Sequence, residues 1–411
     1  MEKEIAALEI RSKTITLVLG NVQDNKVNIT NCVVRPLSVA LKDGEVLDSS
    51  SLTNDIKNMM VIEDHDHNVK INVNEVALVL PPYGLEVFNS QKQTTVVSPT
   101  SKIEKIDISN DIMMLKKEKI PKSNLSIIDI IPNYFLIDGD KKFTEPPIGE
   151  TSSQILIDAN IYALETNLVQ DLMDAVARAG VKIRRNVIAP VAASQLFANY
   201  KYSIVTYVLV DSGRKTTSLS FIGNNVVYSS KFFSLGYDVL VDRVAESFNL
   251  LKADAEELVS LYGYDDRKST LDPAICTSTI NGKEVKFYQD DLNAIVVKYF
   301  QDFITQFNDV LADITSEYRD ILTSLNLVFI GENFKINGFK NYLNKFITNF
   351  TCNFPVLPNV GIQDSSIVNC AGAILLSSVY KGTLEDDIKG RINEITREKE
   401  HDVYSETKDE L

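Results

Sequence analysis

One short stretch of the sequence combines residue types that could hold a phosphate group. It begins at Asp211, has Gly213 two positions later, and ends with Thr216 and Thr217. Glycine lets a backbone approach a phosphate closely, threonine hydroxyls can donate hydrogen bonds to it, and an aspartate can orient a metal-bound water. An Asp-x-Gly sequence is also a common hairpin turn, so an ordinary turn remains the alternative at this point.

The neighbouring sequence indicates which elements would position this turn. Apolar runs at 204–210, 217–222 and 226–230 predict strands joined by hairpins, and alternating patterns at 6–20 and 27–34 predict a similar hairpin at the start of the chain. Helices and strands are expected after each of these hairpins. We therefore expect two similar α/β halves that face each other across a cleft, which is a favoured place for a ligand.

The spacing of apolar residues predicts further elements. Strands are expected at 125–131, 134–137, 154–159 and 327–330, and helices at 109–119, 165–179, 291–322, 339–346 and 367–379. The stretch from 81 to 159 differs from its surroundings, because short β-rich runs there surround a polar helical segment. We interpret this stretch as an inserted subdomain.

Length and composition limit the classes of protein to consider. The chain has 411 residues, of which 44% are hydrophobic, so it is not wholly disordered and holds roughly two to four domains. Its 42 Lys and Arg against 56 Asp and Glu give a net charge of −14, which argues against a broad nucleic-acid-binding surface. No apolar run reaches the length of a membrane-spanning helix.

Metal-binding chemistry has little support in the sequence. The cluster Glu63-Asp-His-Asp-His67 carries suitable ligands, but its polar setting before a predicted strand favours a solvated loop. The four cysteines are widely separated and form no CxxC pair. The chain has three histidines in all, which leaves little material for general-base catalysis. We therefore assign no residue to a metal site, and we name no catalytic residue.

The order of the motifs resembles that of the actin-like ATPase superfamily and, within it, the FtsA family of bacterial cell-division proteins. The resemblance covers about residues 5–382. The two phosphate hairpins of the superfamily look like 7–13 and 209–218, and its adenosine motif looks like 327–338. The segment from Ile127 to Gly149 is similar to a subdomain that is particular to FtsA.

The resemblance implies an α/β fold, the actin-like two-domain fold of the FtsA type, with subdomains 1A, 1C, 2A and 2B. The expected parts are subdomain 1A at 1–80, 160–203 and 367–383, subdomain 1C at 81–159, subdomain 2A at 204–240 and 323–366, subdomain 2B at 241–322, and an acidic polar tail at 384–411.

The resemblance also implies ATP or ADP as a ligand between the two hairpins. The residues that match the nucleotide motifs are Glu9, Arg11, Ser12, Lys13, Asp211, Gly213, Arg214, Lys215, Thr216, Thr217, Glu256, Gly331 and Glu332.

Several of these positions depart from the family's pattern. Arg11 stands where glycine is usual, Arg214 and Lys215 lie in a glycine-rich turn, and Ser218 replaces an aspartate. A larger side chain occupies space that the backbone would leave to a phosphate, and the lost aspartate makes Mg²⁺ doubtful. These three cations, together with Lys13, either replace part of the charge of the metal or are solvated residues beside a pocket that no longer binds nucleotide.

The departures affect the expected activity. The helix that begins at 188–191 offers no carboxylate to orient an attacking water, so we expect ATP hydrolysis to be weak or absent. By resemblance, the protein would be a cytoskeletal adaptor that forms filaments through subdomain 1C and links FtsZ polymers to the division site, together with other division proteins. The alternative is an active ATPase or a sugar-kinase-like enzyme of the same fold.

The predicted location is cytoplasmic, at the inner face of the cell membrane at the division site. In the tail, Ile388, Ile392 and Ile395 form a narrow apolar stripe among acidic residues. Because an anionic bilayer would repel these acids, we expect membrane contact to be weak or indirect.

Overall fold

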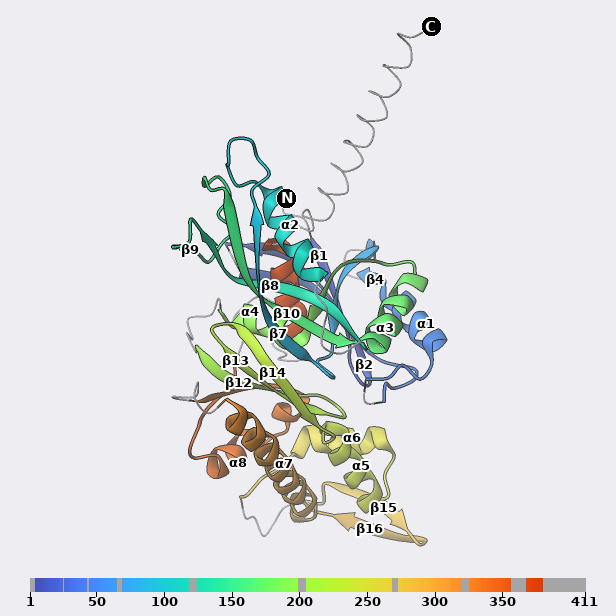
Figure 1. Ribbon diagram of the computed structural model, residues 1–411. Coiled ribbons are helices and arrows are strands. Elements are labelled where there is room, and N and C mark those ends of the chain that lie inside the picture. The colour runs from blue at the N-terminus through green and yellow to red at the C-terminus, as the bar shows by residue number, and fades with distance from the viewer. Residues whose placement is uncertain are drawn as a thin grey trace.

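The computed structural model describes residues 4–24, 26–42, 44–64, 69–117, 124–198, 205–267, 273–318, 325–355 and 367–379. These residues form two lobes, each built on a five-stranded sheet, and a smaller sheet beside the first lobe (Figure 1). The predicted tail at 384–411 and residues 65–67 of the cluster at 63–67 lie outside the described residues.

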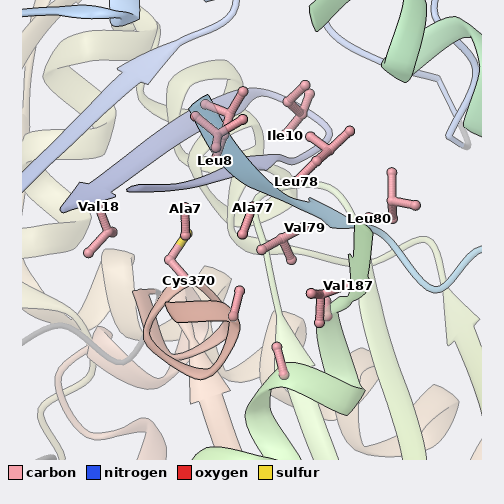
Figure 2. Packing of buried hydrophobic residues seen from close by; sticks show 14 of the residues in the cluster. Ala7, Leu8, Ile10, Val18, Ala77, Leu78, Val79, Leu80, Val187 and Cys370 are labelled. Atoms are coloured by element: carbon pink, nitrogen blue, oxygen red, sulfur yellow. The ribbon is translucent and has the colours of Figure 1, made fainter. Parts of the chain in front are cut away.

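The sheet of the first lobe begins with the predicted N-terminal hairpin. Its strands are β1 (Ile5–Ile10), β2 (Thr14–Gln23), β3 (Lys26–Pro36), β6 (Glu75–Leu80) and β11 (Lys182–Ile188), in the order β11-β6-β1-β2-β3. The first three strands are antiparallel, whereas β6 and β11 run parallel to β1. Strand β1 is buried on both faces: Ala7 points toward Cys370 of helix α9 (Val368–Val379), and Leu8 points to the opposite face (Figure 2).

The sheet of the second lobe repeats this topology. Its strands are β12 (Thr206–Ser212), β13 (Thr217–Gly223), β14 (Val226–Phe233), β17 (Asn326–Gly331) and β18 (Thr351–Asn353), in the order β14-β13-β12-β17-β18. Again three antiparallel strands are followed by two that run parallel to the first. The two similar halves expected from the sequence are therefore present.

Helices cover both sheets. The first lobe has α1 (Ser49–Met59), α3 (Thr166–Arg178), α4 (Ala189–Ala198) and α9 (Val368–Val379), and the second has α5 (Tyr237–Phe248), α6 (Lys252–Tyr262), α7 (Gln289–Glu317), α8 (Phe339–Phe346) and the 3-10 helix η1 (Glu332–Lys335). Helix α7 is a single helix of 29 residues, and its buried positions follow helical spacing from Leu292 to Ile314. Two short hairpins complete the lobes: β4 (Val61–Asp64) with β5 (Val69–Asn72), and β15 (Cys276–Ile280) with β16 (Lys283–Phe287).

The third sheet comes from the stretch interpreted as an inserted subdomain, at 81–159, although its last strand continues beyond that stretch to Glu165. It contains β7 (Glu86–Thr95), β10 (Gln154–Glu165), β8 (Leu125–Ile137) and β9 (Lys141–Phe143), in that spatial order and all antiparallel. Helix α2 (Lys105–Lys116) packs on it, around a core of its own that includes Ile108, Leu115 and Phe135. The two strands predicted at 125–131 and 134–137 are one strand, because a bulge beside Pro132 shifts the register without ending the pairing.

Candidate functional site

The two hairpins that the sequence singled out face each other between the lobes, and their turns have the same frame. The N–H of Arg11 donates to the carbonyl of Thr14 at 2.8 Å, and the N–H of Gly213 donates to that of Thr216 at 2.9 Å. The strand registers also correspond, so that Glu9 in β1 is equivalent to Asp211 in β12. Arg11 therefore occupies the position of Gly213 in the other hairpin.

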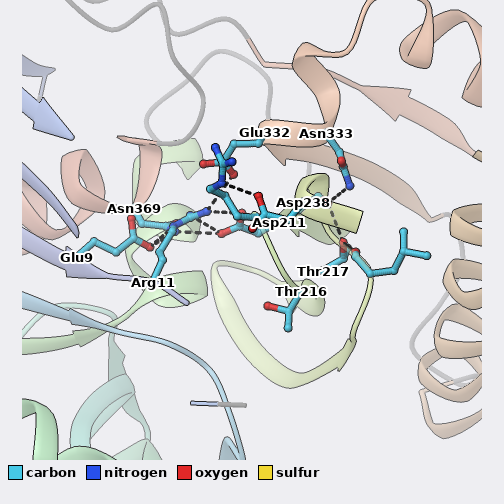
Figure 3. A network of polar contacts seen from close by, with 12 residues as sticks. Glu9, Arg11, Asp211, Thr216, Thr217, Asp238, Glu332, Asn333 and Asn369 are labelled. Atoms are coloured by element: carbon cyan, nitrogen blue, oxygen red, sulfur yellow. Dashed lines mark hydrogen bonds and ion pairs between the residues drawn. The ribbon is translucent and has the colours of Figure 1, made fainter. Parts of the chain in front are cut away.

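The side chain of Arg11 crosses from the first lobe to the second (Figure 3). Its Nη2 and Nη1 atoms donate to the two carboxylate oxygens of Asp211, at 2.7 and 3.2 Å. Its Nε lies 3.0 Å from Oε1 of Glu9, and Nη1 lies 3.9 Å from Oε2 of Glu332. One guanidinium thus lies among three carboxylates, with the bidentate geometry that is the strongest form of such a pair.

An amide from the C-terminal helix completes this group. Asn369, at the start of α9, is 1% exposed and donates to Glu9 at 2.9 Å and to Asp211 at 3.1 Å. We call Glu9, Arg11, Asp211, Glu332 and Asn369 the Arg11 cluster. Its members come from both lobes and from elements far apart in the sequence.

Burial controls the electrostatics of the Arg11 cluster. Burial alone would lower the pKa of Arg11, but the three surrounding carboxylates outweigh it and hold this pKa well above its ordinary value. Burial raises the pKa of Glu9 and of Glu332, although the charge of Arg11 acts in the opposite direction. The guanidinium is therefore charged at any physiological pH, and these two carboxyl groups retain protons more readily than free ones.

Two of the other predicted cations, Arg214 and Lys13, also contact carboxylates. In the second hairpin, Arg214 bonds to Asp238 through Nε at 2.8 Å and to both oxygens of Glu256 at 2.7 and 2.9 Å. The hydrogen bonds to Glu256 are the main reason that the pKa of Arg214 is raised. Lys13 of the first hairpin forms an ion pair with the same Asp238, which begins α5. Lys215 is partly buried and has no ion pair within the described part of the chain.

The two threonine hydroxyl groups predicted for the site lie in different places, that of Thr216 in the cleft and that of Thr217 in the core. Thr216 forms a hydrogen bond of 2.9 Å with the hydroxyl of Tyr83 across the lobes. Thr217 is fully buried, donates to the carbonyl of Leu235 at 2.8 Å, and lies 2.7 Å from the hydroxyl of Ser212. The structure therefore places Thr216, but not Thr217, where it lines the cleft.

The adenosine-type motif has a packing role in this structure. Gly331 ends β17 with a φ of +104°, and a Cβ atom there would lie 2.2 Å from the carbonyl oxygen of Ser212. Only glycine allows the close approach of β17 to β12 at this point. The next residue, Glu332, is thereby directed toward Arg11, as Figure 3 shows.

The space left between the hairpins is small. A cavity of about 60 Å³ is bordered by residues from both lobes, among them Ser12, Tyr83, Ala189, Thr216 and Ser218. Sites for ligands of nucleotide size usually enclose about 300–1,000 Å³. Among the described residues, ATP and Mg²⁺ do not fit between the two turns, because Arg11 pairs with Asp211 and the cavity beside this pair is well below the size of a nucleotide site.

Further observations concern metals and membranes. Within the described residues, no group of three or more His, Cys, Asp or Glu side chains is arranged to hold a metal ion. Among the helices described, none has both the length and the apolar character that crossing a bilayer requires. Ala189 begins α4 beside the cavity and supplies no carboxylate there.

Sequence reasoning missed three residues of this site, namely Asp238, Asn369 and Tyr83. Asp238 lies in the first turn of a predictable helix, where an acid is favoured by the helix dipole alone. Asn369 lies in the apolar helix predicted at 367–379, and Tyr83 follows two prolines. Nothing in the local pattern of these residues indicates a partner in the other lobe.

Comparison with curated proteins supports the resemblance. No family model matches the chain. A protein named cell division protein FtsA from Buchnera aphidicola is 23% identical over 327 residues, which are 79% of this chain and 72% of that protein. The FtsA proteins of Streptococcus pneumoniae and Bacillus subtilis are 23% and 20% identical, over 62% and 68% of this chain and 55% and 62% of their own lengths. The chain is similar to FtsA, as its motifs predicted.

Comparison with solved structures supports the fold. A chain of the PilM-PilN type IV pilus biogenesis complex is similar over 93% of this chain and 99% of its own, with a TM-score of 0.56 and 16% identity. MreB5 of Spiroplasma citri bound to AMPPNP is similar over 94% of this chain and 98% of its own, with a TM-score of 0.52 and 10% identity. The FtsA-like chain has the actin-like α/β fold that was expected.

Proposed function

We propose that this FtsA-like protein is a cytoskeletal adaptor of bacterial cell division, cytoplasmic and located at the inner face of the membrane at the division site. The observation that carries the proposal is the combination of an actin-like fold with sequence similarity to proteins named cell division protein FtsA over 79% of the chain. Its proposed partners are FtsZ polymers, further copies of itself and other division proteins. Contact with the membrane is weak or indirect.

Filament formation is assigned to the third sheet, within the proposed subdomain 1C at 81–159. Strand β7 lies at one edge of that sheet and β9, of three residues, lies at the other. An edge strand offers free backbone groups to a neighbouring chain. This subdomain also carries exposed apolar residues, among them Val97 at 66% and Met114 at 52% exposure. These features support an interface between copies.

Nucleotide chemistry plays a small part in the proposed function. ATP or ADP is the ligand class that the actin-like fold suggests, but the pairing of Arg11 with Asp211 leaves no room for either between the two hairpins in the closed cleft. Hydrolysis is proposed to be weak or absent, because α4 begins with Ala189 and because Arg11 engages Asp211. A phosphate-release assay tests the alternative of an active enzyme. Turnover of about one per second or more would place the chain among ordinary enzymes and would contradict the proposal.

Co-sedimentation tests the link to FtsZ. The full chain is mixed with polymerised FtsZ from the same organism and centrifuged, and we expect it to pellet with the polymers. The matched control is FtsZ that lacks its C-terminal peptide, which should polymerise and leave the chain in the supernatant. Equal recovery with the two forms of FtsZ, or none with either, would contradict the adaptor function.

A further inference from the structure

We propose that Arg11 is a built-in ionic clamp, which holds the two lobes together in the absence of nucleotide and occupies the place where a nucleotide and its metal would otherwise supply that link. The inference concerns the cleft alone and holds whether or not FtsZ is the partner of the protein.

The contacts of the clamp run from one lobe to the other. Arg11 extends from the first hairpin to Asp211 of the second, and Lys13 of the same hairpin reaches Asp238 at the start of α5. Asn369 of the first lobe also donates to Asp211. Each of these contacts would be lost if the cleft opened, so together they favour the closed arrangement.

The charges of the Arg11 cluster require a cation at this position. Without Arg11, the carboxyl groups of Glu9, Asp211 and Glu332 would face one another in a mostly buried space, with side-chain exposures of 5, 15 and 17%. Buried like charges are unfavourable unless a cation or protons neutralise them. In this chain the cation is covalently part of the protein, so closure needs no metal from solution.

The backbone of the opposite hairpin leaves room for the clamp. A Cβ atom at Gly213 would be in ordinary van der Waals contact with Nη1 of Arg11, at 3.7 Å, so only a side chain longer than a methyl group would crowd the guanidinium. The carbonyl groups of Gly213 and Arg214 accept hydrogen bonds from the N–H groups of Tyr237 and Asp238. The second hairpin is thus fixed on α5 and presents Asp211 as a rigid acceptor.

Hydrogen–deuterium exchange of the full chain tests the clamp. We compare exchange at residues 9–16 and 211–218 between the wild type and Arg11→Met, which keeps an unbranched apolar side chain and removes the guanidinium with its charge. The wild type should exchange equally with and without millimolar Mg·ATP. The variant should exchange at least about tenfold faster in both hairpins. Millimolar Mg²⁺ alone should slow exchange in the variant, because three carboxylates are left without their cation, and should not affect the wild type.

The matched control is Arg178→Met, since Arg178 is an exposed arginine whose ion pair with Asp174 lies on the surface of α3. Its exchange at the two hairpins should equal that of the wild type. If Arg11→Met does not fold, Arg11→Lys keeps the charge and loses the bidentate geometry, and it must still exchange faster than the wild type. Equal exchange in the Arg11 and Arg178 variants would overturn the proposal. Protection of the wild-type hairpins by Mg·ATP would also overturn it.

Discussion

The two hairpins that face each other between the lobes have the same backbone frame in their turns, and they differ in the side chain at one turn position. Both turns close with the same hydrogen bond, from Arg11 to Thr14 and from Gly213 to Thr216. One hairpin carries a guanidinium at the position where the other has no side chain, and Asp211 of the second receives this guanidinium. Two hairpins with the same backbone frame can therefore, through one side chain, form a direct contact between the two halves of the molecule.

The largest expected effect is a difference in stability between substitutions at the two equivalent turn positions, Arg11 and Gly213. Arg11→Met should lower the free energy of unfolding by about 3–5 kcal/mol, because removing one partner leaves buried carboxylates without a counter-charge. Gly213→Ala should change it by less than about 1 kcal/mol, since a Cβ there has only ordinary contacts at 3.5 and 3.7 Å. Urea unfolding of both variants measures the difference, and similar losses at the two positions would break the comparison.

The next effect tests whether the glycine of the adenosine-type motif serves packing. Gly331→Ala combines a positive φ with a contact of 2.2 Å to backbone, and it should lower the free energy of unfolding by about 3 kcal/mol or more. The matched control is Gly282→Ala, which has a positive φ but no atom within 4 Å. The control should lose about 1–2 kcal/mol. Equal losses of stability in the two variants, measured by thermal or urea unfolding, would mean that the positive φ alone explains the effect. That result would contradict the packing role of Gly331.

A smaller, pH-dependent effect is expected at Glu332. Its Oε2 atom is buried without a hydrogen bond, and burial raises its pKa. The folded protein therefore holds this proton more tightly than the unfolded chain, so the contribution of Glu332 to stability falls as pH rises through the raised pKa. Glu332→Gln stays neutral, and it should stabilise the protein by about 1 kcal/mol at pH 7 and by little near pH 4. A destabilised variant at pH 7 would show that attraction to Arg11 outweighs burial.

The smallest effect concerns the cation of the second hairpin. Arg214 is tied within its own lobe to Glu256, whose side chain is 38% exposed, so Glu256→Gln should lower the free energy of unfolding by about 0.2–1 kcal/mol and less at high salt. Exchange at residues 9–16 should not change, because no contact across the cleft is lost. Faster exchange in the first hairpin would mean that the contacts of Arg214 stabilise the contacts of Arg11 across the cleft.

Much of the fold follows from apolar spacing. The helix predicted at 339–346 matches α8, the long helix predicted at 291–322 is α7, and the two strand openings produce the repeated sheets. The hairpin β15–β16 was missed although its turn, Asn281-Gly282, has the sequence that such turns favour. Local periodicity and turn chemistry determine these elements, so a single sequence contains enough information to place them.

The arrangement of the site could not be predicted in the same way. A cation in place of a glycine suggests either a phosphate clamp or a solvated residue, and the sequence does not distinguish these alternatives. The structure reveals a third arrangement, in which Arg11 pairs with Asp211, 200 positions along the chain. Similarly, Thr217 reads as a phosphate ligand, and its buried hydrogen bonds are decided by the packing of Leu235 and Ser212 around it. Pairings of this kind depend on how the lobes meet.

Calorimetric titration of ATP with Mg²⁺ into the wild-type chain tests the central claim most directly. If Arg11 and its carboxylates close the cleft in the absence of nucleotide, the titration should give no saturable heat at millimolar ATP, and the same should hold for ADP. Saturable binding with one site per chain would contradict this account, because the cavity of about 60 Å³ beside Arg11 cannot hold a nucleotide while the clamp is closed.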